Sequence, residues 1–362
     1  MKSLYRFTIC LGLLVVLGVN QLQATLNSFY VFGDGACTTT NNPGAGSLYY
    51  GQRFCNGRVW VEILAQWQNI DFPMNHNWSS FGHSSQNLTN DVNTFVAPVD
   101  ASNALVAIWV ADADIVNNLT PTPLFGPPYD ASKLGAWTNS LNQTATNHVR
   151  AIQTLYNKGI RNLVMPNAVD LTKVPVYTDL SAPNKLFVRQ RTIEFNNLFS
   201  VIISNAVAAN SGLRIVQPDI FSLLDTISVN PTNFGLIVSP QTASDNALDQ
   251  GQFVLNGPGA NYMFWDDLHP TAKFQMYIAD RAQQLLSPAR IANITSIGTS
   301  NQLDMTSLPV GRNGVVEIST NFLNWSTAAT VTTTNLNQTV LVNAPGDQGF
   351  YRLRFPFLWS WP

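Results

Sequence analysis

The chain has 362 residues, of which 45% are hydrophobic and only 11% are charged, and its formal net charge is −2. This length suits one large domain and a small one. The weak charge and the scattered Lys and Arg residues exclude the electrostatic footprint of a nucleic-acid-binding protein. They also leave no basic stripe for an anionic membrane surface. Because so few residues are charged, we expect Asn, Thr, Ser and Gln to cover much of the surface.

The N-terminus has the pattern of a secretory signal peptide. Lys2 and Arg6 precede an apolar stretch at residues 7–19, and a plausible cleavage site follows at Ala24. A membrane anchor is the alternative, but the stretch is shorter than the about 20 residues that a span requires. We therefore predict a signal peptide at residues 1–24, a secreted protein, and no integral membrane segment after cleavage.

Two cysteines remain in the predicted mature chain, because Cys10 lies in the signal peptide. In an oxidising compartment, two thiols are more often paired than free. The sequence therefore favours a disulfide between Cys37 and Cys55. The alternative is a pair of buried free cysteines.

Short apolar runs alternate with longer segments of helical periodicity through residues 25–288. The runs are too short for helices, and polar or Gly/Pro/Asp turns follow them. This alternation predicts a parallel sheet covered on both faces, with residues 29–32 as a central strand. The runs lie at residues 29–32, 104–110, 163–165 and 213–216, and the predicted helices begin near residue 59 and span residues 141–156, 185–206 and 271–286.

The pattern changes near Ser287 and Pro288. Stretches rich in Thr, Val, Asn and Ser follow, with turn residues between them and no helical period. We predict a separate small β-sandwich-like module at residues 291–362.

Ligands of open parallel sheets bind beyond the carboxyl ends of the strands. Asp34 and Gly35 follow the first apolar run, and Asp266 and His269 come just before the last predicted helix. An Asp can hold one ring nitrogen of a His and leave the other free to act as a base. The alternative is a helix-capping carboxylate beside a surface histidine.

Several ordered segments resemble the GDSL, or SGNH, lipase/esterase family. Residues 33–42, GDGACTTTNN, resemble the family's opening block, and residues 49–65, YYGQRFCNGRVWVEILA, resemble the segment that precedes its first helix. LYNKGIRNLVMPN, NPTNFGL and WDDLHPT match further family-like stretches in the expected order. The resemblance covers roughly residues 27–286. It implies a flavodoxin-like three-layer α/β/α sandwich and hydrolysis of carboxylic esters.

The resemblance also assigns site residues and exposes two losses. Asp266 and His269 match the last two members of the family's catalytic triad. The nucleophilic Ser is replaced by Gly35, and the Asn that donates to the oxyanion is replaced by Ala113. Gly82 falls at the oxyanion Gly of the second block. Since Gly35 has no side chain, ordinary serine-ester catalysis is chemically excluded there.

Three hypotheses follow from this altered site. The first is a secreted hydrolase in which His269 activates water directly, facing an oxyanion site at Gly35 and Gly82. The second is a non-catalytic protein that binds an acylated glycan or lipid in the old cleft. The third is a surface or structural protein that acts through the C-terminal β-module. No metal constellation stands out, since His76 and His83 are isolated and His148 sits in a helical pattern, so no cofactor is predicted.

Overall fold

The computed structural model describes residues 26–40, 46–122, 125–237, 240–346 and 348–362. The predicted signal peptide, residues 1–24, lies outside them. Within the described residues, no helix is both long enough and apolar enough to cross a membrane.

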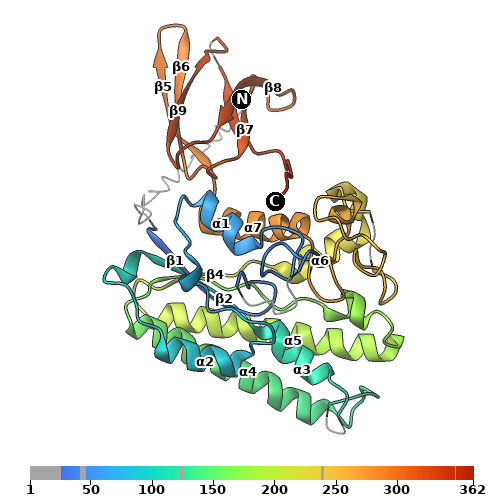
Figure 1. Ribbon diagram of the computed structural model, residues 1–362. Coiled ribbons are helices and arrows are strands. Elements are labelled where there is room, and N and C mark those ends of the chain that lie inside the picture. Colours follow the sequence, from blue (N-terminus) through green and yellow to red (C-terminus); the bar gives the residue numbers. More distant parts are fainter. Residues whose placement is uncertain (1–25, 41–45, 123–124, 238–239, 347) are drawn as a thin grey trace, which may run out of the picture.

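A parallel sheet of four strands forms the centre of the larger part (Figure 1). Their order in the sheet follows their order in the chain, and the strands β1 and β2 are buried almost throughout. Burial on both faces explains why these strands read as continuous apolar runs. The strands are β1 (Ser28–Gly33), β2 (Ala104–Trp109), β3 (Asn162–Val164) and β4 (Arg214–Val216).

β1 is the first of these four strands, not a central one as predicted. Its outer edge is nevertheless covered by the backbone of residues 77–80. The N–H of Trp78 donates to the carbonyl of Val31 at 2.8 Å, and the N–H of Ser80 donates to that of Gly33 at 3.1 Å. Asn77 forms a parallel bridge with Val31. Counting this segment, the spatial order is the 2-1-3-4-5 order of flavodoxin-like sheets.

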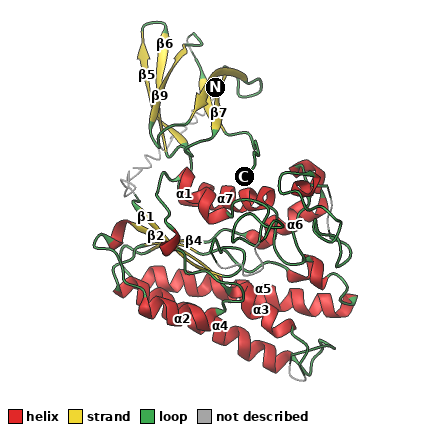
Figure 2. Ribbon diagram, viewed as in Figure 1, coloured by secondary structure: helices red, strands yellow, loops and turns green. Residues whose placement is uncertain are grey.

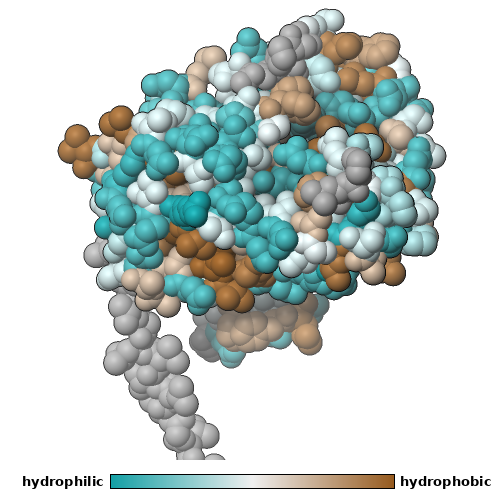
Figure 3. All heavy atoms as spheres, turned by 90° about the horizontal axis from the view of Figure 1, so that it is seen from below, coloured by the Kyte–Doolittle hydropathy of each residue, from teal (hydrophilic) through white to brown (hydrophobic). Residues whose placement is uncertain are grey.

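Helices cover both faces of the sheet, which confirms the predicted three-layer fold (Figures 1 and 2). One face carries α1 (Trp60–Trp67) and α7 (Ala272–Leu286). The other carries α2 (Ser85–Thr94), α4 (Leu134–Asn157) and α5 (Ala182–Ala209). The last two helices are α3 (Ala111–Leu119) and α6 (Ile220–Val229). The surface seen in Figure 3 is largely hydrophilic, with separate apolar patches.

Local signals explain where two of the predicted helices begin and end. The hydroxyl of Thr271 accepts from the N–H of Phe274 at the start of α7. Gly159 follows the end of α4 with a φ of 94°, a left-handed conformation that favours glycine. The helix α3 was not predicted, because residues 111–114 read as a polar turn. Its Asp112 and Asp114 lie in the first helical turn, where the helix dipole favours negative charge.

The C-terminal residues form two antiparallel three-stranded sheets, as predicted for a β-sandwich-like module. They have their own small apolar core, which includes Leu303, Met305 and Val316. One sheet contains β5 (Arg290–Ile297), β6 (Ser300–Thr306) and β9 (Gln338–Asn343). The other contains β7 (Asn313–Ser319), β8 (Ser326–Thr332) and β10 (Phe350–Arg354).

The segment after β10 returns to the larger part of the chain. Phe357 and Trp359 pack against the main core. The indole N–H of Trp361 donates to the carbonyl of Asn56 at 2.8 Å. The side chain of Asn56 in turn accepts from the N–H of Ala272, at the start of α7, at 2.8 Å. The last residues thus brace the loop that leads from residue 49 to α1.

Candidate active site

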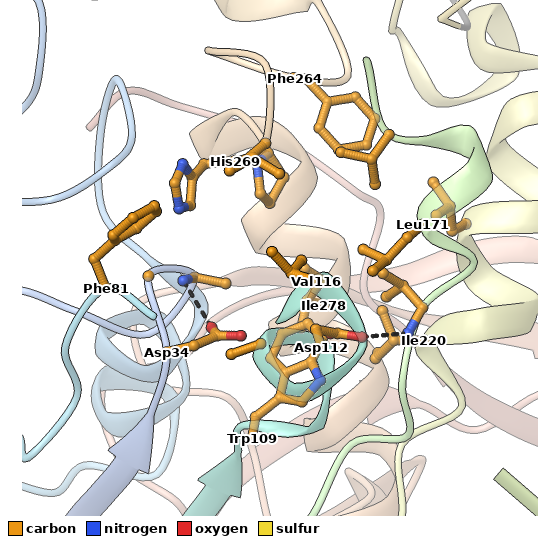
Figure 4. Close-up of a pocket in the computed structure, with 18 of the residues that line it drawn as sticks. Asp34, Phe81, Trp109, Asp112, Val116, Leu171, Ile220, Phe264, His269 and Ile278 are labelled. Atoms are coloured by element: carbon orange, nitrogen blue, oxygen red, sulfur yellow. Dashed lines mark hydrogen bonds between the residues drawn. The ribbon is translucent and has the colours of Figure 1, made fainter. Parts of the chain in front are cut away.

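The predicted site residues converge at the carboxyl end of the sheet (Figure 4). Gly35 follows β1, Ala113 lies in the first turn of α3 after β2, and His269 precedes α7. The N–H of Asp34 donates to the carbonyl of Trp109 at 3.1 Å, so the ends of β1 and β2 are held together. Gly35, Gly82, Ala113 and His269 all line one cavity.

Asp266 holds His269 through several hydrogen bonds. Nδ1 of His269 is 2.9 Å from both carboxylate oxygens. The backbone N–H groups of Leu268 and His269 donate to Oδ1 of the same carboxylate at 2.9 and 2.6 Å. The hydroxyl of Tyr49 donates to Oδ2 at 3.1 Å. The arrangement fixes the ring orientation and leaves Nε2 free for chemistry.

The pair of charges shifts both pKa values. Burial lowers the pKa of His269, but the carboxylates of Asp266, Asp34 and Asp267 outweigh it, and the net shift is upward. Burial raises the pKa of Asp266, yet the charge and hydrogen bonds of His269 and the N–H of Leu268 bring it below its usual value. Each partner therefore stabilises the charged form of the other.

His269 points directly at Gly35. A Cβ atom placed on Gly35 would lie 2.4 Å from Nε2 of His269. This confirms that the two residues are neighbours, as predicted. The ring stacks on Phe54 at 4.7 Å between centroids, and Phe81 lies on it at 5.7 Å. Any side chain at position 35 would therefore have to displace a ring held on several sides.

At the predicted oxyanion positions the structure leaves two backbone N–H groups unpaired. Within the described part of the chain, the N–H groups of Gly35 and Gly82 have no acceptor. Gly82 has a φ of 73°. The N–H of Ala113 is already bound to the carbonyl of Val110 at 3.1 Å, and its methyl group offers no donor. Ala113 thus has no free hydrogen-bond donor.

The cavity beside His269 has a volume of about 200 Å³ and a mainly apolar lining. Ile220, Leu171, Phe264 and other apolar side chains surround it (Figure 4). A cavity of about 150 Å³ holds a benzene molecule. The space therefore fits a group of roughly six to eight non-hydrogen atoms.

Two buried carboxyl groups, of Asp34 and Asp112, also line this cavity. The sequence drew attention to their position after the apolar runs but assigned neither side chain a role. Burial raises the pKa of Asp34 to about 6, although the N–H of Ala36 donates to its Oδ1 at 3.0 Å. Burial, and then the charge of Asp34, raise the pKa of Asp112 well above its usual value. The N–H of Val169 donates to Oδ1 of Asp112 at 2.9 Å. Their position after β1 and β2 was the available signal.

The predicted disulfide between Cys37 and Cys55 is wrong, since both residues are buried free thiols. Each sulfur has its own partner. The indole N–H of Trp60 donates to Sγ of Cys37 at 3.3 Å. Cys55 donates to the carbonyl of Pro270 at 3.4 Å. The two thiols thus make separate hydrogen bonds, one with Trp60 and one with Pro270, and form no disulfide.

Metal ligands do not gather in the described residues: they contain no group of three or more His, Cys, Asp or Glu that could hold a metal ion. His148 is buried in α4, with Nδ1 2.8 Å from the carbonyl of Thr144. Burial lowers its pKa to about 4, which suits a neutral structural residue.

A parallel α/β/α sandwich with a His–Asp pair beyond the strand ends is the architecture of an SGNH-type hydrolase. The chain belongs to the GDSL-like lipase/acylhydrolase family, whose model matches residues 29–282. The members of that family are ester hydrolases, so the family places this chain among hydrolases of small-molecule esters.

Similar proteins with assigned names are esterases or lipases. The chain is 23% identical to the GDSL esterase/lipase At1g71250 of Arabidopsis thaliana, over 72% of this chain and 85% of that protein. It is 20% identical to an acetylesterase of Thermothelomyces thermophilus, over 68% of this chain and 80% of that protein.

Solved structures with similarity to this chain include the lipase Lip_vut3 from a goat rumen metagenome, with a TM-score of 0.44. The two sequences are 10% identical, and the match covers 70% of this chain and 95% of that one. They also include Axe2, an acetylxylan esterase from Geobacillus stearothermophilus, with a TM-score of 0.41 and 12% identity over 72% and 96% of the two chains.

Proposed function

We propose that this protein hydrolyses esters of short acyl chains, with water instead of a serine hydroxyl as the nucleophile. The observation that carries the proposal is the contact between His269 and the bare backbone of Gly35. An intact His–Asp pair faces a position with no side chain, at the edge of an apolar cavity. The esterase and lipase names of the relatives support ester substrates.

The chemical step needs one water molecule and the ester. Nε2 of His269 takes a proton from the water as its oxygen attacks the carbonyl carbon. The resulting tetrahedral intermediate collapses, the bond to the alcohol oxygen breaks, and His269 returns its proton to that oxygen. The products are the free acid and the alcohol, and no acyl group is ever attached to the protein. Asp266 orients the ring and stabilises the imidazolium.

Charge that develops on the carbonyl oxygen is stabilised by the backbone N–H groups of Gly35 and Gly82. Ala113 removes a side-chain donor that is worth roughly a hundred- to thousand-fold in comparable sites. Loss of a serine nucleophile costs about a million-fold in turnover. General-base catalysis by a positioned histidine restores about 10²–10⁴-fold over the uncatalysed reaction. We therefore expect slow hydrolysis.

Export of the protein is part of the proposal. The basic residues, apolar stretch and cleavage site of residues 1–24 support a secreted enzyme. Its substrates would then be esters outside the cytoplasm, including acylated glycans or lipids whose acyl group fits the cavity.

A binding protein without catalysis is the second candidate. Two replacements favour it: Gly35 stands where the family has its nucleophile, and Ala113 stands where the family has a side-chain oxyanion donor. Such a protein would hold an acyl ester in the same cavity and release it unchanged.

The test measures hydrolysis of p-nitrophenyl butanoate by the wild type, by His269→Ala and by the control His83→Ala. His83 is a partly exposed histidine near Asp91, so its loss should leave the rate unchanged. We expect His269→Ala to lose at least a hundred-fold. The wild type should show no burst of product and no labelling by a fluorophosphonate probe. Equal rates for wild type and His269→Ala would refute the enzyme, and ester binding without turnover would favour the second candidate.

A further inference from the structure

Four polar side chains line the cavity and take no part in the proposed hydrolysis: Asn117, which is exposed, and Asp34, Asp112 and Trp109, which are buried. The three buried ones lie together across the cavity from Phe264 (Figure 4). Most of the other lining is apolar. Buried polar groups in an apolar cavity are costly unless a partner satisfies them.

The indole N–H of Trp109 is such an unsatisfied group. The residue is 3% exposed, and its Nε1 atom has no hydrogen-bond partner within the described residues. It acts on Asp112 as a weak hydrogen-bond donor that lowers the pKa of this carboxyl, although the pair does not meet full hydrogen-bond geometry. A donor of this kind is available to an acceptor atom of a ligand.

The two carboxyl groups each have an oxygen to spare. The N–H of Ala36 donates to Oδ1 of Asp34, and the N–H of Val169 donates to Oδ1 of Asp112. Among the residues described, the only further hydrogen-bonding interaction that another residue makes with either carboxyl is the weak one between the indole N–H of Trp109 and Asp112. Both side chains are buried.

Both carboxyls favour the protonated form more than an exposed aspartate does. Burial raises the pKa of Asp34 to about 6. Burial, and then the charge of Asp34, raise the pKa of Asp112 well above its usual value. The cavity thus offers carboxyl oxygens that can accept a hydrogen bond, beside the indole donor of Trp109.

A hydroxyl group matches this set, because it donates one hydrogen bond and accepts others. An ammonium group cannot accept from the indole N–H, and a methyl group would leave all three polar groups unsatisfied. We propose that Asp34, Asp112 and Trp109 form a hydroxyl-binding subsite, so that the cavity selects a short acyl chain that bears a hydroxyl group. The assignment of this hydroxyl to the acyl chain rests on the proposed function.

The test uses two ligands of the same size, 4-hydroxybutanamide and pentanamide, which differ only in a terminal hydroxyl in place of a methyl group. Their binding to the whole chain is measured by ligand-observed NMR titration. We expect the hydroxylated amide to bind about tenfold more tightly, since a site that hydrogen-bonds a hydroxyl is penalised when the hydroxyl is absent. Asp34→Asn, which replaces a carboxyl oxygen by an NH2 donor, and Trp109→Phe, which removes the indole N–H, should each abolish this preference. Neither should weaken the binding of pentanamide by as much.

Asp114→Asn is the matched control. Asp114 is another aspartate of α3, but its carboxylate accepts from the N–H and the hydroxyl of Ser85 instead of lining this cavity. It should retain the tenfold preference. Equal affinities in the wild type, no binding of either ligand, or a preference that survives both substitutions would overturn the subsite. Thermal melts identify a variant that fails to fold, in which case the other variant decides. Because binding is read without turnover, a failure of the subsite is distinct from a failure of hydrolysis.

Discussion

Nδ1 of His269 lies 2.9 Å from both carboxylate oxygens of Asp266, and the same carboxylate also receives two backbone N–H groups. The carboxylate therefore orients the ring and holds its own place before α7. An asparagine at position 266 could still accept from the backbone but would carry no charge. The substitution thus separates the electrostatic role of Asp266 from its structural one.

Asp266→Asn should lower ester hydrolysis by roughly ten- to a thousand-fold, and by no more than His269→Ala does, because the carboxylate acts only through the histidine. With the carboxylate gone, burial dominates the pKa of His269, which falls. The pH at half-maximal rate should therefore move downward, because a general base works above its pKa. Rate–pH profiles of the variant and of Asp267→Asn provide the comparison, since Asp267 is exposed and its charge raises the pKa of His269 less than Asp266 does, so its shift should be smaller. An unchanged profile for Asp266→Asn would contradict this role.

The same pair makes stability depend on pH. The pKa of His269 is raised above 6.5, so its contribution is complete below 6.5 and is lost as pH rises through the folded value. The pKa of Asp266 is lowered below 3.8, so its contribution is present above 3.8 and is lost as pH falls through the folded value. The loss of melting temperature in Asp266→Asn should thus be largest between about pH 4 and 6.5. Melting curves at pH 5.5 and pH 9 test this, and an equal loss at both would exclude the ion pair as the cause.

The substitution Asp112→Asn should raise the free energy of unfolding relative to the wild type, by an amount that grows as pH rises. In the unfolded chain this carboxyl ionises near 3.8, whereas burial and Asp34 raise its folded pKa well above that. The native state therefore loses stability as pH rises from 3.8 through the folded value. The amide, which can still accept from Val169, removes this penalty of about 1–3 kcal/mol. Denaturant unfolding should show no gain at pH 3.5 and a clear gain at pH 8, and a gain independent of pH would argue against the buried charge.

Much of the fold was readable from the sequence because its signals are local. The strands β1 to β4 are short apolar runs bounded by turn residues, and Asp266 and His269 stand three positions apart before a Pro-led helix. What could not be read depends on tertiary contacts. The stacking of Phe54 on His269 joins residues 215 positions apart, and the cluster of Asp34, Asp112 and Trp109 arises only when β1 and β2 pair.

The cysteines illustrate the same limit. Two thiols in a chain that is predicted to be exported favour a disulfide by count alone, but pairing depends on distance and direction. Here the indole of Trp60 and the carbonyl of Pro270 hold the two sulfurs in separate contacts.

The thiols should be inert in the native protein and reactive after unfolding. Burial raises the pKa of Cys55 to about 12 and that of Cys37 well above its usual value, which suppresses the reactive thiolate. Titration of a chain that begins at Thr25, which lacks Cys10, with a chromogenic disulfide reagent at pH 8 should give no fast reaction, and titration in guanidinium should give two thiols. Cys37→Ser and Cys55→Ser single variants should each give one. Zero thiols in guanidinium would contradict the free state.

Restoring a serine at position 35 should not by itself restore serine-type catalysis. The φ of Gly35 lies outside the left-handed region, so the backbone accepts a side chain, but its Cβ would lie 2.4 Å from Nε2 of His269 and 3.2 Å from Phe81. The ring is fixed by Asp266 and stacked on Phe54, so Gly35→Ser alone should displace it and lower both hydrolysis and melting temperature. Phe81 is 53% exposed, and its removal costs little burial. In Gly35→Ser with Phe81→Ala the imidazole has room to withdraw, and the hydroxyl can then reach Nε2.

The double variant should therefore gain a burst of p-nitrophenol and labelling by a fluorophosphonate probe, both signs of a covalent acyl-enzyme. Adding Ala113→Asn should raise turnover by about a further hundred-fold, as expected for a regained oxyanion donor. Phe81→Ala alone is the control, since it frees the ring without supplying a nucleophile. If Gly35→Ser alone labels as strongly as the double variant, then His269 yields without help from Phe81, and crowding is not what opposes a nucleophile at this position.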